Sequence, residues 1–319
     1  MEEFQHEPVL PEEVLRWLSP ALGPGLTLVD CTSGGAGHAR ALLRALDGLR
    51  LIGLDRDAAA IAAATERLRP FGDRVRLVRS DFSALTDVLE RLGVEAPAGV
   101  LYDLGVSSPQ LDHAERGFRY RGDAPLDMRM DRSQPLTAAD VVNGYDERRL
   151  ARVIGTLGEE RFAGRIARAI VRRRAERPFS GTEDLAAVVR DAIPAATRRT
   201  GPHPARRTFQ AIRIEVNGEL DALRASLPAA IGALRPTGRV AVISYHSLED
   251  RIVKRTFADA ARGCRCPPDV PVCVCGRIPE VRLLTRRPVR PGPEEIAANP
   301  RADSARLRVA EKLAPGEAA

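Results

Sequence analysis

Four acidic residues each end or follow a short run that is expected to form a strand, and they are the first candidates for chemistry. Asp30 ends the run at 28–30, Asp55 ends the run at 51–55, and Asp103 ends the run at 99–103. The pair Asp81 and Phe82 follows the run at 74–78, where an acid and an aromatic ring could bracket an adenine. Such runs predict buried strands, and open α/β sheets bind ligands outside the carboxyl ends of their strands. The acids are therefore expected to line one site.

The turn between the first two strands is rich in glycine and indicates the class of ligand. Glycines at 34, 35 and 37 precede a helix expected at 39–46. A strand, a glycine-rich turn, a helix and a second strand ending in Asp55 form a Rossmann-like unit, in which that acid accepts hydrogen bonds from ribose hydroxyls. Arg40 replaces the third glycine of the dinucleotide motif, and Asp30 would put negative charge beside a pyrophosphate. S-adenosylmethionine is therefore favoured over NAD, and a tight turn without a ligand is the simpler alternative.

The segment after the fourth strand indicates which group is methylated. Enzymes that methylate exocyclic base nitrogens carry a short polar–proline motif at this place. The motif accepts hydrogen bonds from the amine, localises its lone pair and positions it for transfer. Ser108 and Pro109 match this motif, whereas Gln110 stands where an aromatic residue is common. A proline-bounded turn explains the segment equally well.

Length and charge limit the remaining possibilities. The chain has 319 residues, a formal net charge of +6 and a pI near 9.4, which suits one large domain or two modest ones and permits an acidic partner such as nucleic acid. Nearly all the positive charge is arginine, which a GC-rich genome explains as well as function does. No apolar segment has the layout of a signal peptide or approaches the roughly 20 residues of a membrane span. We expect a cytoplasmic protein without a membrane partner.

The pattern changes after residue 110 and predicts a second domain. No strand-like run occurs from 111 to about 205, and helices are expected at 138–142, 147–155, 159–177 and 182–192, with Thr137 and Thr182 as N-caps. Strand-like sequence returns at 239–244. We therefore expect a helical domain, 111–205, inserted into a discontinuous sheet domain formed by 1–110 and 206–319.

Basic side chains follow one face of the helix expected at 159–177. They are Arg161, Arg165, Arg168, Arg172 and Arg173, and they lie opposite the apolar positions of the same helix. Such a row could contact RNA phosphates without reading sequence. A solvated arginine face is the commoner explanation.

Four cysteines form a paired pattern in a proline-rich stretch. They are Cys264, Cys266, Cys273 and Cys275. Four thiolates in so short a span could bind zinc, but the C-x-C spacing is tighter than the usual gap of two to four residues. Reduced thiols or redox-labile pairs are the alternative, and we assign no metal ligand from the sequence. Cys31 is expected to be a small packed residue.

Several segments, in order along nearly the whole chain, resemble one family. They are HEPVL at 6–10, DLGVSSPQLD at 103–112, GF at 117–118 through PLDMRM at 125–130, GEERF at 158–162, TFQAIRI at 208–214, SYHSLEDR at 244–251 and NPRA at 299–302. The chain resembles the bacterial 16S ribosomal RNA cytosine N4-methyltransferases, the RsmH or MraW family. The resemblance implies a class I S-adenosylmethionine-dependent fold with an inserted helical domain. It also implies methylation of N4 of a decoding-centre cytidine in 16S rRNA, within the small ribosomal subunit.

The cofactor-binding candidates combine the glycine turn with the positions implied by the resemblance. They are Gly34, Ala36, Gly37, His38, Asp55, Phe82, Asp103 and Gln110. Ala36 stands where the family usually has glycine, and its methyl group would crowd the methionine moiety unless φ stays negative.

The catalytic candidates are Asp103, Ser108 and His246. We assign Asp103 to the cofactor first and to base positioning second, and Ser108 to the cytosine amine. His246 could accept a proton, contact RNA or serve a purely structural role. Arg213 and Asn217 are further candidates for the groove. A DNA amino-methyltransferase and a non-catalytic RNA-binding protein are the rival classes.

Overall fold

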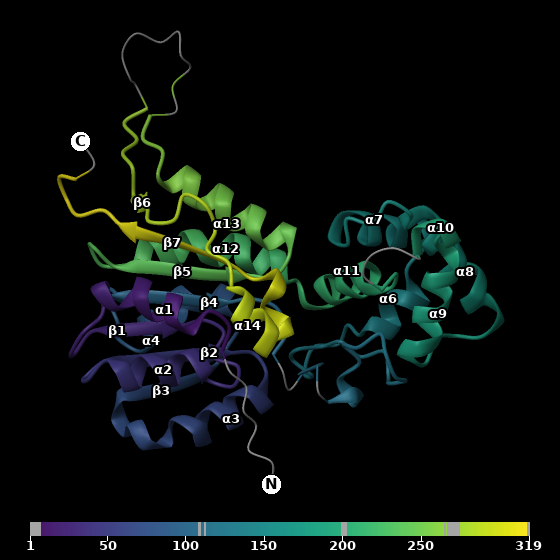
Figure 1. Cartoon of the computed structure of the whole chain (residues 1–319), viewed down its shortest axis with the longest axis horizontal. Helices are drawn as coiled ribbons and strands as arrows, with labels where there is room; N and C mark the ends of the chain where they lie inside the picture. Colours follow the sequence, from purple (N-terminus) through teal and green to yellow (C-terminus); the bar gives the residue numbers. More distant parts are fainter. Residues whose placement is uncertain are drawn as a thin grey trace. The chain divides into compact units, whose positions relative to one another are not determined.

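The computed structural model describes residues 8–107, 110–111, 113–198, 203–264, 266 and 275–317. The chain divides into two compact units. Unit 1 contains Met1–Gly105 and Leu220–Ala319, and unit 2 contains Val106–Glu219. Each unit has its own buried core. The helices and strands of both units are drawn in Figure 1.

Unit 1 is built around one sheet of seven strands, as Figure 1 shows. Their order is β3-β2-β1-β4-β5-β7-β6, and β1 to β5 are parallel while β7 runs antiparallel to β5 and β6. The strands are β1 (Thr27–Asp30), β2 (Arg50–Asp55), β3 (Val75–Arg79), β4 (Gly99–Asp103), β5 (Arg239–Ser244), β6 (Val281–Leu283) and β7 (Arg306–Lys312). This arrangement confirms the predicted Rossmann-like α/β fold.

Helices cover both faces of this sheet because successive strand residues point to opposite sides. Leu28 and Leu51 pack under one set of helices, and Val29 and Ile52 pack under the other. The first set is α1 (Pro11–Leu18), α2 (Gly37–Ala45) and α3 (Ala58–Leu68). The second set is α4 (Leu85–Arg91), α12 (Glu219–Ala233) and α13 (Ser247–Ala260). A short helix, α14 (Pro293–Ala298), precedes β7.

Unit 2 is helical in its described part and contains no named strand there. Its helices are α6 (Ala138–Gly144), α7 (Glu147–Leu157), α8 (Ala163–Glu176), α9 (Thr182–Ala192), α10 (Ala195–Arg198) and α11 (Arg206–Asn217). The Thr137 hydroxyl caps α6 in a capping box with Asp140, as the sequence predicted. None of the helices in the described part of the chain is both long and apolar enough to cross a membrane.

The boundary after the insertion differs from the predicted one at 205/206. Helix α11 lies in unit 2, because Phe209 and Ile212 are part of its buried core. The side chain of Asn217 accepts a hydrogen bond from the Met130 N–H (2.8 Å) and donates one to the Met128 carbonyl (2.8 Å). These contacts between distant parts of the sequence move the boundary to Glu219/Leu220.

Two local helix predictions in unit 2 were wrong. Helix α8 begins at Ala163 rather than at 159, because Glu159 has φ of 48°, which is incompatible with a right-handed helix. Thr182 is the first residue of α9 and not its N-cap, which is Gly181. The Thr182 hydroxyl instead donates to the Gly122 carbonyl at 3.0 Å, so that it joins two loops of the unit.

Candidate active site

The register of the sheet brings three predicted acids to the same end of neighbouring strands. Asp30 lies opposite Gly53 on β2 and opposite Leu101 on β4. Asp55 and Asp103 therefore lie two residues beyond Asp30, on the strands to either side of it. Because β1, β2 and β4 are parallel, all three carboxyl groups lie at the carboxyl edge of the sheet, where α/β sheets bind ligands.

The carboxylate of Asp55 is fixed by backbone donors. Its Oδ2 accepts a hydrogen bond from the Gly34 N–H (2.8 Å), and its Oδ1 accepts one from the Asp57 N–H (2.8 Å). Burial nevertheless raises the pKa of Asp55 from its ordinary value of 3.8 to about 6. Asp55 thus joins β2 to the glycine turn and keeps lone pairs for further donors, such as ribose hydroxyls.

The turn from Gly34 to α2 contains a buried alanine with a left-handed backbone. Ala36 is fully buried and has φ of 58° and ψ of 29°, in the left-handed region. The condition that φ stay negative at this residue is therefore not met. An L-residue in this region costs roughly 1–2 kcal/mol relative to glycine. A Cβ on Gly37 would lie 3.2 Å from the Pro8 Cβ, so the first turn of α2 is tightly packed.

Asp103 is the best-held acid of the site. The Tyr245 hydroxyl donates to its Oδ1 at 2.7 Å, and the His38 Nε2 lies 3.4 Å from its Oδ2. Its backbone N–H donates to the Thr32 hydroxyl at 2.6 Å. Burial, followed by the negative charge of Asp103, raises the pKa of Tyr245 well above its ordinary value. Tyr245 therefore stays a proton donor and fixes the orientation of this carboxylate.

The imidazole of His38 is buried and incompletely satisfied. Within the described part of the chain, neither Nδ1 nor Nε2 has a hydrogen-bond partner of good geometry, and Asp103 is its close charged neighbour. Buried polar atoms are nearly always paired, by protein, water or ligand. The position of His38 at the start of α2 therefore fits a residue that a polar ligand completes.

Asp30 is the most deeply buried of the three acids, with 2% of its surface exposed. Burial raises its pKa from the ordinary 3.8 to about 7. His38 and the Thr32 N–H, which donates to Oδ1 at 3.1 Å, oppose this rise, and Asp103 and Asp55 add to it. A cation at this edge of the sheet would be stabilised by Asp30 and would in turn favour its ionised form.

The residues after β3 contribute mainly to structure. Asp81 caps the following turn by accepting from the Ser83 N–H (2.8 Å), and it lies 3.3 Å from the Arg56 guanidinium. Phe82 is buried and packs edge-on against Tyr102, with ring centroids 5.6 Å apart. Its contact with an adenine stays a prediction, and little of its ring is exposed for such a contact.

His246 occupies the N-cap of α13 in a capping box with Glu249. Its Nδ1 accepts from the Glu249 N–H (3.4 Å), and its Nε2 lies 3.1 Å from the Glu249 carboxylate. Oε2 of the buried Glu249 accepts in turn from the N–H of Tyr245 (2.8 Å). These contacts favour the structural role for His246: with Glu249 it fixes the turn that carries Tyr245. A catalytic role stays a prediction.

The remaining predicted residues lie in unit 2 or outside the described residues. Ser108 and Pro109 lie outside them. Gln110 is buried in unit 2 and accepts from the Ser107 N–H at 3.1 Å. Arg213 pairs with both carboxylate oxygens of Glu219 at 2.9 and 3.0 Å, and this ion pair gives Arg213 a structural role.

The family model and the curated relatives indicate the same family. A family model described as the MraW methylase family matches residues 3–313. The chain is 58% identical over 318 residues to "Ribosomal RNA small subunit methyltransferase H" of Symbiobacterium thermophilum, covering 99% of each protein. It is 52% identical over 311 residues to the protein of that name from Brevibacillus brevis, covering 97% of this chain and 98% of the relative. A solved structure, a putative rRNA-methylase from Clostridium thermocellum, aligns over 95% of both chains with a TM-score of 0.44 and 12% identity.

The chain belongs to the MraW methylase family. It is a methyltransferase, and its cofactor is S-adenosylmethionine. The candidate site fits this group in three respects. A cationic methionine end suits the acids at the strand ends, ribose hydroxyls suit Asp55, and the buried imidazole of His38 has donor and acceptor capacity to spare. Asp30, Asp55, Asp103 and His38 are the residues that would hold it.

Sequence reasoning missed one residue of the candidate site. Tyr245 follows β5 immediately, and its hydroxyl touches Asp103 on the neighbouring strand. The signal was available, because β5 was predicted to end at Ser244 and residues after parallel strands gather at one edge. What the sequence could not supply was the pairing of β4 with β5.

Proposed function

We propose that this chain methylates the N4 amine of a decoding-centre cytidine of 16S rRNA, within the small ribosomal subunit in the cytoplasm. Three observations support the proposal. The curated relatives carry a small-subunit rRNA methyltransferase name at 52–58% identity. The sheet brings acids to one strand edge. The carboxylate of Asp103 is held by Tyr245 at the end of β4, and this last observation carries the chemistry.

The reaction requires an unreactive amine to attack a methyl group. S-adenosylmethionine supplies that methyl group on a positively charged sulfur. The lone pair of the cytosine amine is delocalised into the ring, so the protein must localise it and stabilise the positive charge that develops on nitrogen. Asp103 can accept a hydrogen bond from the amine, and its negative charge stabilises the positive charge that develops on the nitrogen.

Tyr245 and His38 prepare this carboxylate from two sides. The Tyr245 hydroxyl occupies Oδ1 (2.7 Å), which leaves Oδ2, beside His38, as the oxygen with more capacity for an incoming donor. Fixed dipoles of this kind act without reorganisation during the reaction. The amine proton is expected to leave through Asp103 or to solvent, and Ser108 stays the predicted second acceptor for the amine.

The arginine row supports binding to RNA, with two changes to the predicted set: Arg161 precedes the first residue of α8, and Arg173 is engaged within unit 2. Arg173 is bound to Asp184 and to the Arg177 carbonyl (2.6 Å), so it stabilises unit 2. Arg165 and Arg172 are exposed on the same helix. Exposed arginines of this kind add sequence-independent affinity for phosphates.

The test is transfer of labelled methyl from S-adenosylmethionine to small subunits that lack the modification, followed by mass analysis of the nucleosides. The label is expected as N4-methylcytidine and is expected to be lost with Asp103→Ala. An Asp47→Ala variant, which changes an exposed aspartate of the same unit, is the matched control. Label on another nucleoside, or none on RNA while the cofactor binds, would overturn the proposal.

The same assay separates the rival substrates. A DNA amino-methyltransferase would label duplex DNA, and a non-catalytic RNA-binding protein would label nothing. Because phosphate contacts along the rRNA add affinity that a free nucleoside lacks, partly assembled subunits are expected to be far better substrates than free cytidine. Equal labelling of the free nucleoside would refute this part.

A further inference from the structure

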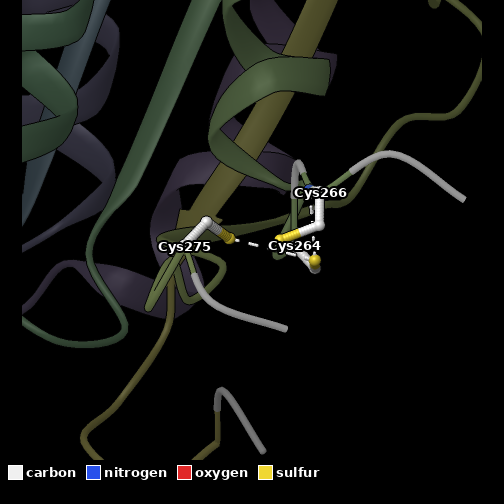
Figure 2. Close-up of side chains that lie close together, drawn as sticks. All are labelled: Cys264, Cys266 and Cys275. Carbon is white, nitrogen blue, oxygen red and sulfur yellow. Dashed lines mark hydrogen bonds between the residues drawn. The ribbon is translucent and has the colours of Figure 1, made fainter. Parts of the chain in front are cut away.

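Three cysteine side chains converge between α13 and β6, apart from the site described above. The Sγ atoms of Cys264, Cys266 and Cys275 all lie within 4.8 Å of one another. Figure 2 shows the three side chains turned toward a common point, with the sulfurs of Cys264 and Cys275 3.8 Å apart. Cys264 and Cys275 are eleven positions apart in sequence, so the fold and not local spacing brings them together.

The separation of the sulfurs matches a metal site and not a covalent bond. A disulfide needs about 2.05 Å between sulfurs, and among the described cysteines there is no disulfide. A tetrahedral zinc ion with Zn–S bonds of about 2.3 Å places its thiolates about 3.8 Å apart. The distance from Cys264 Sγ to Cys275 Sγ is 3.8 Å, which is one edge of that tetrahedron.

The backbone around the cluster also suits thiolates. The Cys266 N–H donates to the Cys264 sulfur at 3.3 Å. The short C-x-C spacing produces this contact and is therefore compatible with a metal site. A hydrogen bond to sulfur favours its charged form, which is the form that binds metal. Gly276 follows Cys275 with φ of 60°, a turn that suits glycine.

We propose that Cys264, Cys266 and Cys275 bind a zinc ion as thiolates. Three S–H bonds are replaced by three Zn–S bonds, the three protons go to solvent, and no oxidant or reductant takes part. Sulfur ligands in tetrahedral array select zinc among the common divalent cations. Cys273, the fourth cysteine of the sequence pattern, lies outside the described residues, so the described part of the chain supplies three of the four ligands that a tetrahedral zinc ion takes.

The place of the cluster makes it a structural site. Helix α13 ends at Ala260, before the first cysteine of the cluster. After the last cysteine, two hydrogen bonds join the chain to the end of α13. The Arg277 guanidinium donates to the Asp259 carbonyl (2.8 Å), and the Glu280 N–H donates to the Ala260 carbonyl (2.8 Å). Zinc would tie Cys264 to Cys275 beyond these contacts. Helix α13 has 14 residues and is therefore about 20 Å long, which separates the cluster from the turn of Tyr245 at its other end.

The test uses the full chain, purified without a metal-binding tag and without chelator. We expect about one zinc ion per chain by elemental mass spectrometry. Cobalt added to the zinc-depleted protein is expected to give the visible bands of a tetrahedral site and a thiolate charge-transfer band. The charge-transfer band should weaken in each of Cys264→Ser, Cys266→Ser and Cys275→Ser, and zinc should be lost from the triple variant.

Cys31→Ala is the matched control, because it removes a buried thiol of the same unit and should retain the zinc. Urea unfolding followed by the fluorescence of Trp17 shows whether each variant still folds. Cofactor binding should persist in the triple variant, since the cluster lies at the far end of α13. Three results would each overturn the proposal. The wild-type protein could lack zinc even after purification with added zinc, mass analysis of reduced preparations could find a disulfide, or the folded triple variant could retain zinc.

Discussion

Burial of Asp30 predicts that the cofactor-free protein loses stability as the pH rises from about 4 to about 7. Asp30 has 2% of its surface exposed, and its pKa is raised from 3.8 to about 7. Between these two values the unfolded chain is ionised at this residue and the folded chain holds a proton. The folded state therefore binds more protons, and its stability falls as the pH rises from about 4 to about 7 and stays low above that.

The size of the effect follows from the difference between the two values. At about 1.4 kcal/mol per pH unit, the difference between 3.8 and about 7 corresponds to about 4 kcal/mol. Asp30→Asn removes this loss, because an amide does not ionise. Asparagine also keeps the oxygen that accepts from the Thr32 N–H. The variant is therefore expected to equal the wild type near pH 4 and to exceed it by up to about 4 kcal/mol at pH 8.

Urea unfolding without cofactor at pH 4, 6 and 8 measures the difference. Trp17 is the only tryptophan of the chain and packs at the edge of the unit 1 core, so its fluorescence reports on the unfolding of the unit that contains Asp30. Asp55 also has a raised pKa, near 6, but it contributes to both proteins and largely cancels in the difference. Asp47→Asn makes the same chemical change at an exposed position and controls for the substitution itself. A constant difference between Asp30→Asn and wild type from pH 4 to pH 8 would refute the reasoning.

Three other substitutions test the structure. Tyr245→Phe removes the hydroxyl that donates to the β4 carboxylate, and methyl transfer should slow about ten- to a hundredfold while cofactor binding changes less; an unchanged kcat would contradict the positioning role. Asp250→Ala removes the carboxylate that pairs with the buried Arg308 guanidinium at 2.7 and 3.2 Å. The free energy of unfolding, measured in urea, should fall by about 3–5 kcal/mol, because a buried charge is left unpaired. A loss below about 1 kcal/mol would contradict a stabilising role for this pair. Replacing Arg165 and Arg172 by glutamine should lower affinity for rRNA and make the salt dependence of binding shallower, by roughly 0.7–0.9 for each phosphate that is no longer neutralised; a parallel salt plot would show that they do not touch phosphates.

Four of the five parallel strands could be predicted from the sequence because each is an apolar run between polar turns. The fifth, β3, was also predicted, although it carries Arg76 and Arg79 and none of its residues is buried. β5 matches its predicted bounds at Arg239–Ser244, and β4 matches at Gly99–Asp103. The two strands β6 and β7 were not predicted. β6 has three residues, two of them exposed, and β7 alternates charged residues with apolar ones although Arg308 and Glu311 are buried. Their charges are satisfied by long-range ion pairs that no local pattern contains.

The site likewise contains residues that local patterns predict and contacts that only long-range pairing creates. Asp30, Asp55 and Asp103 could be placed at one edge because parallel strands order their ends. The partners of Asp103 could not, since Tyr245 reaches it across 142 positions of sequence. The left-handed backbone of Ala36 was not predicted either, because alanine rarely adopts it and nothing in the local sequence requires it.

The insertion of unit 2 also determines the order in which the protein can fold. Strands β4 and β5 are neighbours, and their register pairs Gly99 with Arg239, yet the whole of unit 2 is synthesised between them. Contacts so distant in sequence form late, because a long loop must first close. During translation β4 therefore waits with one edge unpaired, and an unpaired strand edge invites association with other chains. Unit 2 is continuous in sequence and can complete its own core in that interval, while three of the seven strands, β5, β6 and β7, are still missing.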